Sequence, residues 1–160
     1  MLGINAKLYY NSASYGSPTW VEVSLLSDCQ LNFTWDEGAA DDRSDPAHRM
    51  VKTQFSLEVT GSLKKKISNT AVDYLLDLAI SRAAGDFLVL DGPRTTVGSR
   101  GFRFDGQVFA ASEDQALGNV IYAALTVKPT DSDNLVKAVK VGAGPALTFA
   151  TVGGDSTSFA

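Results

Sequence analysis

Residues 31–60 read LNFTWDEGAADDRSDPAHRMVKTQFSLEVT and contain two strand patterns separated by a charged stretch. From Val51 to Thr60 apolar residues alternate with polar ones, which is the period of a strand with one buried face. Leu31, Phe33 and Trp35 alternate in the same way before the charged stretch. We therefore expect one strand that ends at Trp35 and another that begins at Val51 and stops at Gly61.

The connection between these strands, Asp36–Met50, is fifteen residues long and too charged for a hairpin turn. Fully extended, it would reach roughly 50 Å. Compact domains seldom keep a structureless loop of this length unless it binds, covers or joins a partner. The sequence therefore predicts that this loop contacts a neighbouring molecule.

The rest of the chain is dominated by short strand patterns bounded by turn residues. They occupy residues 4–10, 20–26, 87–90, 102–111, 120–128 and 135–141. The first two are expected to form a hairpin, Gly106 is expected to mark a bulge or bend, and residues 120–128 read as a strand buried on both faces.

One amphipathic helix is predicted between the strands. Thr70 with Asp73 resembles a capping box at its start, and Gly85 has the left-handed preference of a helix stop. Its apolar stripe has helical spacing and comprises Val72, Leu75, Leu76, Ala79, Ile80 and Ala83. A single helix among strands must cover a sheet, so the fold class is mainly β: an antiparallel sandwich-like or barrel-like domain with one flanking α-helix.

Composition narrows the function classes. The chain has 160 residues, of which 44% are hydrophobic and 20% are charged, and these values are typical of one globular domain. Its formal net charge of -4 argues against a surface that binds nucleic acid. A lone cysteine, no signal-like start and no long apolar run predict a reducing cytoplasm as the site of synthesis and no membrane insertion. We expect a β domain over residues 1–141 and a Gly-, Ala-, Ser- and Thr-rich extension over residues 142–160 that contacts neighbouring subunits.

Residues suited to catalysis or ligand binding are sparse. His48 reads as a solvent-exposed loop residue rather than a catalytic base, and Cys29 as a small buried residue rather than a nucleophile. Asp41, Asp42 and Asp45 could hold a hard cation but fit a solvated surface better. Four aromatic residues could stack on a sugar or fill a core or subunit contact: Tyr9, Tyr10, Tyr15 and Trp20. No enzyme activity, cofactor or metal is expected.

The charges of the loop and of the segment after it have opposite signs. The loop carries Asp36, Glu37, Asp41, Asp42, Arg43, Asp45, His48 and Arg49. A basic set follows it: Lys52, Lys64, Lys65 and Lys66. Opposite signs favour docking of the loop on a neighbouring copy in a head-to-tail assembly, and two separate solvated surfaces are the alternative.

In the order of its elements and in short local matches, the chain resembles the tail-tube, or major tail, proteins of long-tailed bacteriophages. The resemblance spans roughly residues 3–141, and is carried by GINAKLYY (3–10), PTWVEVSLL (18–26), DCQLNF (28–33), the acidic excursion, FSLEVTGSL (55–63), NTAVDYLLDLA (69–79) and LTVKP with TDSDN (125–134). It implies six copies in a ring, stacked rings and a conduit for genomic DNA without sequence-specific binding.

The resemblance further implies that the long loop packs on adjacent subunits and that the termini make contacts between rings. Implied partners are other copies of the chain and the tape-measure, tail terminator and baseplate proteins. The implied location is the virion tail, after assembly in the host cytoplasm. A carbohydrate-binding β-sandwich module is the main alternative, and a small β-barrel enzyme or ligand carrier is the weaker one.

Overall fold

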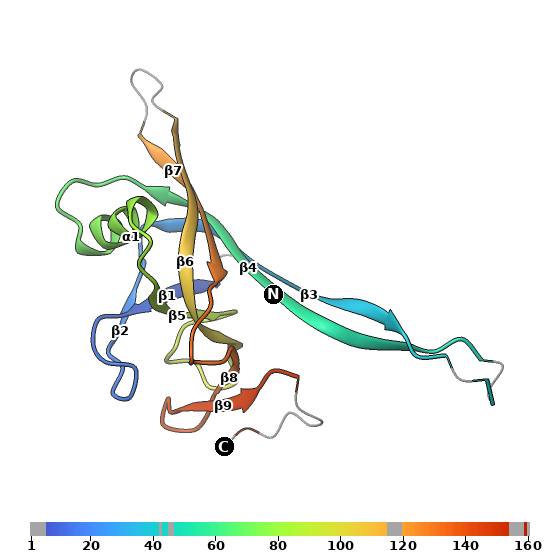
Figure 1. Ribbon diagram of the computed structural model, residues 1–160. Coiled ribbons are helices and arrows are strands. Elements are labelled where there is room, and N and C mark those ends of the chain that lie inside the picture. Colours follow the sequence, from blue (N-terminus) through green and yellow to red (C-terminus); the bar gives the residue numbers. More distant parts are fainter. Residues whose placement is uncertain (1–5, 42, 45–46, 115–119, 154–158, 160) are drawn as a thin grey trace.

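The computed structural model describes residues 6–41, 43–44, 47–114, 120–153 and 159. Within these residues the chain forms nine strands and one helix (Figure 1). They are β1 (Lys7–Asn11), β2 (Trp20–Glu22), β3 (Leu26–Ala39), β4 (Met50–Lys64), α1 (Thr70–Ile80), β5 (Gly85–Leu90), β6 (Arg100–Asp114), β7 (Tyr122–Pro129), β8 (Lys137–Val141) and β9 (Leu147–Thr151).

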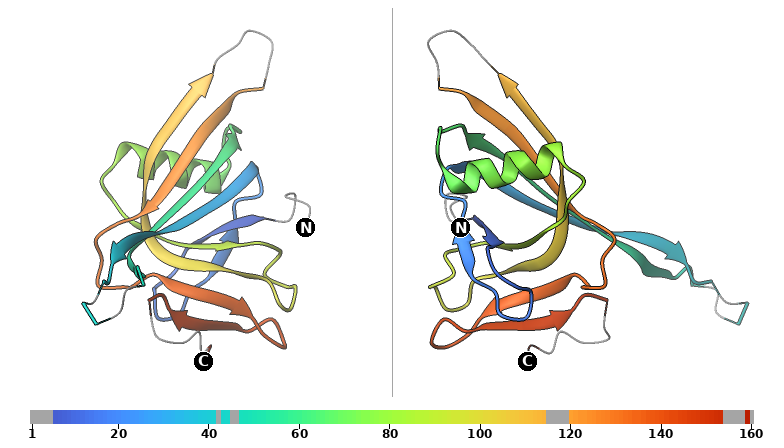
Figure 2. Two further views of the ribbon diagram at one scale, coloured as in Figure 1. Left: turned by 90° about the vertical axis from the view of Figure 1, so that its right-hand side faces the viewer. Right: turned by 60° about the vertical axis from the view of Figure 1, so that its left-hand side comes forward.

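The strands form one antiparallel sheet that curls into a half-barrel. Along its main path the order is β2-β1-β5-β6-β7-β4-β3. Helix α1 lies across one face of this sheet, and the β3–β4 hairpin extends far beyond the body (Figures 1 and 2). The main core fills the space between sheet and helix, where Leu75, Phe87 and Phe104 are at most 1% exposed. The mainly β fold with one flanking helix is as the sequence predicts.

Strand β6 belongs to two parts of the sheet. Residue Gly106 pairs with β5 on one side and with β7 on the other. Strand β7 follows β6 from Gly106 to Asp114, whereas β8 pairs with Arg100–Arg103. The β8–β9 hairpin covers the far side of β5, where a second apolar cluster includes Leu88, Leu90, Val139 and Val141. Strand β5 is therefore buried on both faces, which explains its continuous apolar run.

Helix α1 differs in detail from its sequence prediction. The N-cap is Asn69, whose side chain accepts a hydrogen bond from the backbone of Val72, so Thr70 is the first helical residue instead of the cap. The helix ends at Ile80, and Gly85 is the first residue of β5 rather than a left-handed stop. Ile80 is 88% exposed and does not belong to the buried stripe. The buried helix positions are Ala71, Val72, Leu75 and Leu78.

Several strand predictions also need correction. Strand β4 continues past Gly61 to Lys64, because Gly61 pairs with Leu125 of β7. The bulge in β6 lies between Val108 and Ala110, not at Gly106. Strand β7 alternates between buried and exposed positions, so it has one buried face instead of two. The N-terminal part of the first predicted strand, with Ile4, lies outside the described residues.

The extension over residues 142–160 contains a strand that the sequence did not predict. Strand β9 pairs with β8 of the same chain from Leu147 to Thr151, and Ala150 is 4% exposed. The turn between them has Gly144 at a positive φ of 67°, which suits glycine. At least this part of the extension is therefore tied to its own domain.

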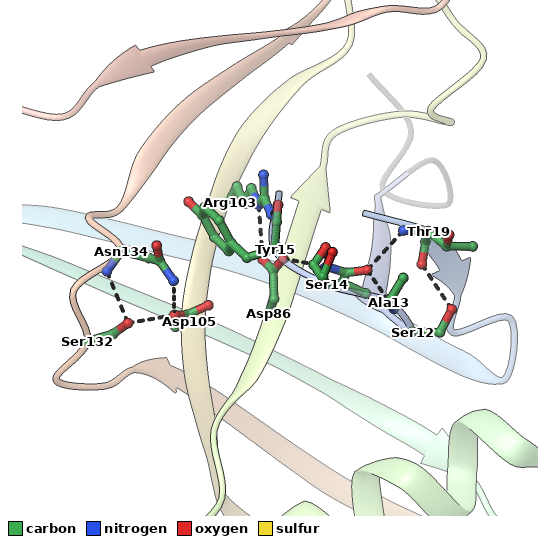
Figure 3. Close-up of polar contacts among 11 residues, drawn as sticks. Ser12, Ala13, Ser14, Tyr15, Thr19, Asp86, Arg103, Asp105, Ser132 and Asn134 are labelled. Atoms are coloured by element: carbon green, nitrogen blue, oxygen red, sulfur yellow. Dashed lines mark hydrogen bonds and ion pairs between the residues drawn. The ribbon is translucent and has the colours of Figure 1, made fainter. Parts of the chain in front are cut away.

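A buried ion pair fixes the β1–β2 loop to the sheet (Figure 3). Arg103 of β6 is 5% exposed and donates from Nε and Nη2 to the two carboxylate oxygens of Asp86, at 3.0 and 2.6 Å. Its Nη2 also donates to the carbonyl of Tyr15, whose ring lies 3.7 Å from the guanidinium carbon. Asn11 donates to the same aspartate, and its side-chain oxygen accepts from the amides of Ala13 and Thr19. These contacts give the buried charge of Arg103 a carboxylate and a carbonyl as partners, which offsets the cost of its burial.

Removing one side of this ion pair should destabilise the domain strongly. In Asp86→Ala the guanidinium of Arg103 stays buried without its carboxylate, and we expect a loss of about 3–5 kcal/mol in the free energy of unfolding measured by urea denaturation. The control is Glu22→Ala, which breaks the exposed Lys7–Glu22 pair at 2.8 Å and should cost less than about 1 kcal/mol. Equal losses in the two variants would contradict the assigned role of Asp86.

Candidate assembly interface

The β3–β4 hairpin beyond the body is called the arm here and comprises residues 35–55. Register pairs join Trp35 to Phe55 and continue to Ala39 and Met50. Strand β4 pairs with β7 only from Val59 onward, so in the described chain each strand of the arm pairs solely with the other. Two-stranded ribbons of this kind are marginal in water and expose two unpaired backbone edges. The arm is therefore the part of the fold that most needs a partner.

The expected loop over residues 36–50 is shorter in the structure. Residues 36–39 lie in β3 and Met50 lies in β4, so Asp36 and Glu37 belong to a strand. The sequence does not alternate there because both faces of the ribbon are exposed and neither demands apolar residues. The predicted loop is therefore shortened at both ends by strand pairing, and the connection between the two strands runs from residue 40 to residue 49.

The tip of the arm is held by Asp41. Its carboxylate lies 2.9 Å from Nδ1 of His48 and accepts a hydrogen bond from the backbone of Arg49 at 3.0 Å. His48 is 67% exposed, which fits a surface residue. Arg43 is exposed, and Asp42 and Asp45 lie outside the described residues.

At the base of the arm, four aromatic rings from three strands pack together. Between ring centres, Phe33 lies 5.2 Å from Phe102 and 6.3 Å from Phe55, and Trp35 lies 5.1 Å from Phe55. Phe33 nevertheless remains 53% exposed. Such pairs prefer these tilted geometries and stabilise the base, while the exposed part of Phe33 offers apolar surface for a contact. Sequence reasoning placed these rings on strand faces but did not bring them together, because the register was unknown.

The four strands β6, β7, β4 and β3 end in two open backbone edges. One is the outer edge of β3, which has β4 as its only partner. The other is the C-terminal half of β6, because β5 pairs with β6 no further than Gly106. Within the described residues nothing covers these edges by strand pairing. A neighbouring chain could add to either one.

One face of this four-stranded sheet carries small and polar side chains instead of a core. We call it the open face; its register rows are Ser112–Ala124–Ser62, Ala110–Thr126–Thr60–Gln30, Lys128–Glu58–Asn32 and Ser56–Thr34. The opposite face contributes Leu57, Val59, Leu125 and Val127 to the main core. Alternation in residues 51–60 and 30–35 is the sequence signal for this face, but only the register reveals rows that cross two to four strands.

The four predicted basic residues do not form one patch. Lys52 is part of the arm, opposite Glu37, with its Nζ 5.7 Å from the centre of the Trp35 ring. Lys64 lies at the other end of β4, roughly 40 Å away along the strand. Lys65 pairs with Glu113 at 2.8 Å, beside the exposed Lys66. The arm and the cluster Lys64–Lys66 therefore lie at opposite ends of the molecule.

Candidate ligand sites from the sequence are occupied by structural contacts. Tyr9 and Tyr10 are 5% and 4% exposed, and one face of Tyr15 lies against Arg103, so these rings form no open sugar platform. Among the described residues no three His, Cys, Asp or Glu side chains are grouped to hold a metal ion. No helix in that part of the chain is long and apolar enough to span a membrane.

The sequence matches no protein-family model and no curated protein. The structure, by contrast, is similar to the tail of an empty gene transfer agent particle refined with C6 symmetry, with a TM-score of 0.61 at 9% identity over 81% of this chain and 92% of that chain. It is also similar to the SPP1 tail tube, with a TM-score of 0.63 at 7% identity over 80% of this chain and 74% of that chain. A chain of the anti-feeding prophage baseplate is similar as well, with a TM-score of 0.58 at 8% identity over 88% of this chain and 96% of that chain. At such identities the likeness shows the fold, which is that of phage tail-tube subunits, as the resemblance in sequence predicted.

Cys29 should be unreactive in the folded protein. Burial raises the pKa of its thiol to about 11, so the reactive thiolate is scarce near neutral pH. We expect alkylation by iodoacetamide at pH 8 to be at least about tenfold slower in the folded protein than in urea, measured by mass spectrometry. Equal rates would show that this thiol is accessible and reopen its role as a nucleophile.

Proposed function

We propose that the chain is the subunit of a phage-type tail tube, in which six copies form a ring, rings stack, and genomic DNA passes through the lumen without sequence-specific binding. The observation that carries this proposal is the pair of open edges on a fold shared with tail-tube structures. A structural role in the virion follows, with no catalytic step.

Strand direction supports closure of the ring. Neighbouring strands in β6, β7, β4 and β3 are antiparallel, so the two edge strands β6 and β3 also run in opposite directions. The β3 edge of one copy can then pair with the β6 edge of the next copy in the same antiparallel manner. Repetition of this heterologous contact closes a barrel and removes every open edge of the four-stranded sheet.

The same closure fixes which face lines the lumen. Six copies contribute about 24 strands, and with ordinary strand spacing and tilt the barrel has a radius of roughly 20–25 Å. A domain of this length has a radius of gyration of about 15 Å, so six bodies with their helices do not fit inside. The helix-covered face must therefore point outward, and the open face lines the lumen.

The arm then serves contacts between subunits. It projects from the body (Figure 1), which suits a reach to the adjacent ring. The acidic residues of the arm are complementary in charge to the cluster Lys64–Lys66. Because the arm and this cluster lie at opposite ends of one molecule, the arm would dock on the cluster of another copy. We also propose that residues of the 142–160 extension beyond β9 contact neighbours, and that tape-measure, terminator and baseplate proteins meet the ends of the tube after assembly in the host cytoplasm.

A carbohydrate-binding module is the less favoured reading. Three of the rings that the sequence offered for sugar stacking are unsuited to it, because Tyr9 and Tyr10 are buried and one face of Tyr15 lies against Arg103. Electron microscopy and size-exclusion chromatography of the purified chain at rising concentration separate the two functions. Rings or tubes support the tail-tube subunit, whereas a monomer at every concentration would refute it.

Deleting the arm should abolish assembly but not folding. Among the described residues, the strand pairs of residues 36–50 all lie within the arm, and none of these residues belongs to either apolar core. Replacing residues 36–50 by a short glycine turn should therefore leave both cores intact. We expect a thermal unfolding midpoint near that of the full chain, together with loss of tubes by negative-stain microscopy. Normal tubes from this variant would contradict the role assigned to the arm.

Charge reversal should test the docking partner of the arm. In the triple variant Lys64→Glu, Lys65→Glu and Lys66→Glu, we expect tube formation to fail at low salt and to recover partly as screening increases. The matched control reverses Lys137 and Lys140 of β8, which lie away from this cluster. Unchanged assembly of the triple variant at every salt concentration would exclude the cluster as the docking site.

A further inference from the structure

The open face carries one cation within the rows defined above. Lys128 of β7 extends over this face with 46% of its side chain exposed, and the surrounding residues are Ser, Thr, Ala, Asn and Gln. Lys64 lies beyond these rows, opposite Tyr122 at the end of the sheet. The charge of the central face is therefore decided by Lys128 and its immediate partner.

That partner is Glu58 on the adjacent strand. Its Oε2 lies 2.9 Å from Nζ of Lys128, and its side chain is 37% exposed. Exposed pairs of this kind contribute little to stability, so the pair is not required by the fold. Its effect is electrostatic, because it removes the net charge of the one row, among the four defined above, that contains ionised groups.

Free cations on a channel wall would hold DNA. Each lysine that contacts a phosphate releases condensed counterions, and binding from this source is strong at low salt and independent of sequence. A ring repeats each of its side chains once per copy, and stacked rings repeat them along the whole tube. An unpaired Lys128 would thus convert the wall into a regular array of phosphate contacts.

We propose that Glu58 neutralises Lys128 so that the wall of the channel does not bind the DNA backbone. This assignment rests on the proposed function, since it requires the open face to line a lumen. Glu58 acts here through Lys128 and not by touching the DNA. Within the four rows the side chains are small or polar and carry no net charge, which lets a polyanion move past without a bound state.

The test uses assembled tubes and a short fluorescent DNA duplex that can enter their open ends. Tubes of wild type, Glu58→Gln, and the double variant Glu58→Gln with Lys128→Gln are sedimented with the duplex at several salt concentrations. We expect Glu58→Gln tubes to retain about tenfold more DNA than wild type at low salt, with steep loss as salt rises. The double variant should return to the wild-type level.

A matched control comes from a second exposed ion pair. Glu22→Gln frees Lys7 in the same way, but this pair joins β1 and β2, away from the open face. Retention by Glu22→Gln tubes equal to that of Glu58→Gln tubes would overturn the assignment to the lumen. Unchanged retention in Glu58→Gln tubes would overturn the neutralising role of Glu58.

Two further results keep the test decisive. If Glu58→Gln alone does not assemble, mixed tubes with wild-type chains replace it, and retention should rise with the fraction of the variant; a flat response refutes the proposal. If wild-type chains form no tubes at all, the proposed function fails first, and the inference about Glu58 falls with it.

Discussion

Backbone hydrogen bonding at the strand edges is the constraint on which the organisation of this protein depends. Nearly every backbone group inside a folded protein finds a partner, and a sheet meets this demand everywhere except at its margins. Here the margins are long: the outer edge of β3, the far half of β6 and both sides of the arm. The domain has a well-packed interior, in which Leu63, Leu75 and Phe87 are fully buried. The backbone groups left unpaired at these margins are available for association, and an exposed edge is a template for pairing with another strand.

The interior is arranged to keep these edges in place. Strand β6 joins the four-stranded sheet to the β5–β8 region, and Arg103 on that strand ties together β5, the β1–β2 loop and, through ring contacts, Phe149 of β9. Gly101, two residues before it, passes so close to β5 that any side chain would collide with the backbone of Val89. A rigid centre of this kind lets a two-stranded arm project at a defined angle, although the arm itself has few contacts with the body.

The sequence predicts the fold class well because alternating apolar residues mark strands, even where an apolar side chain such as Val51 or Phe33 is about half exposed. Residues 51–60 and 31–35 have one apolar face each, and both are strands in the structure. The prediction fails where burial does not shape the pattern: residues 36–39 are strand with both faces exposed, and β9 lies in a segment of small residues. Both Asn and Thr are common N-cap residues, so the sequence does not distinguish Asn69 from Thr70. The N-cap is Asn69, because this residue has the extended backbone conformation that precedes the helix. The open face and the aromatic cluster need cross-strand register, which no local pattern contains.

The even number of strands in the edge-to-edge unit has a geometric consequence for the size of any ring. An odd number would leave the two outer strands pointing the same way and force a parallel seam at every junction. With four strands, every junction between copies is antiparallel whatever the number of copies, so backbone hydrogen bonding does not determine how many subunits form a ring. The number of subunits must then be determined by the angle between the sheets of adjacent copies. That angle depends on side-chain volume where β3 would meet β6, at positions such as Leu31 and Ala111. Channel width would then be encoded in the volume of a few side chains at the seam rather than in the fold itself.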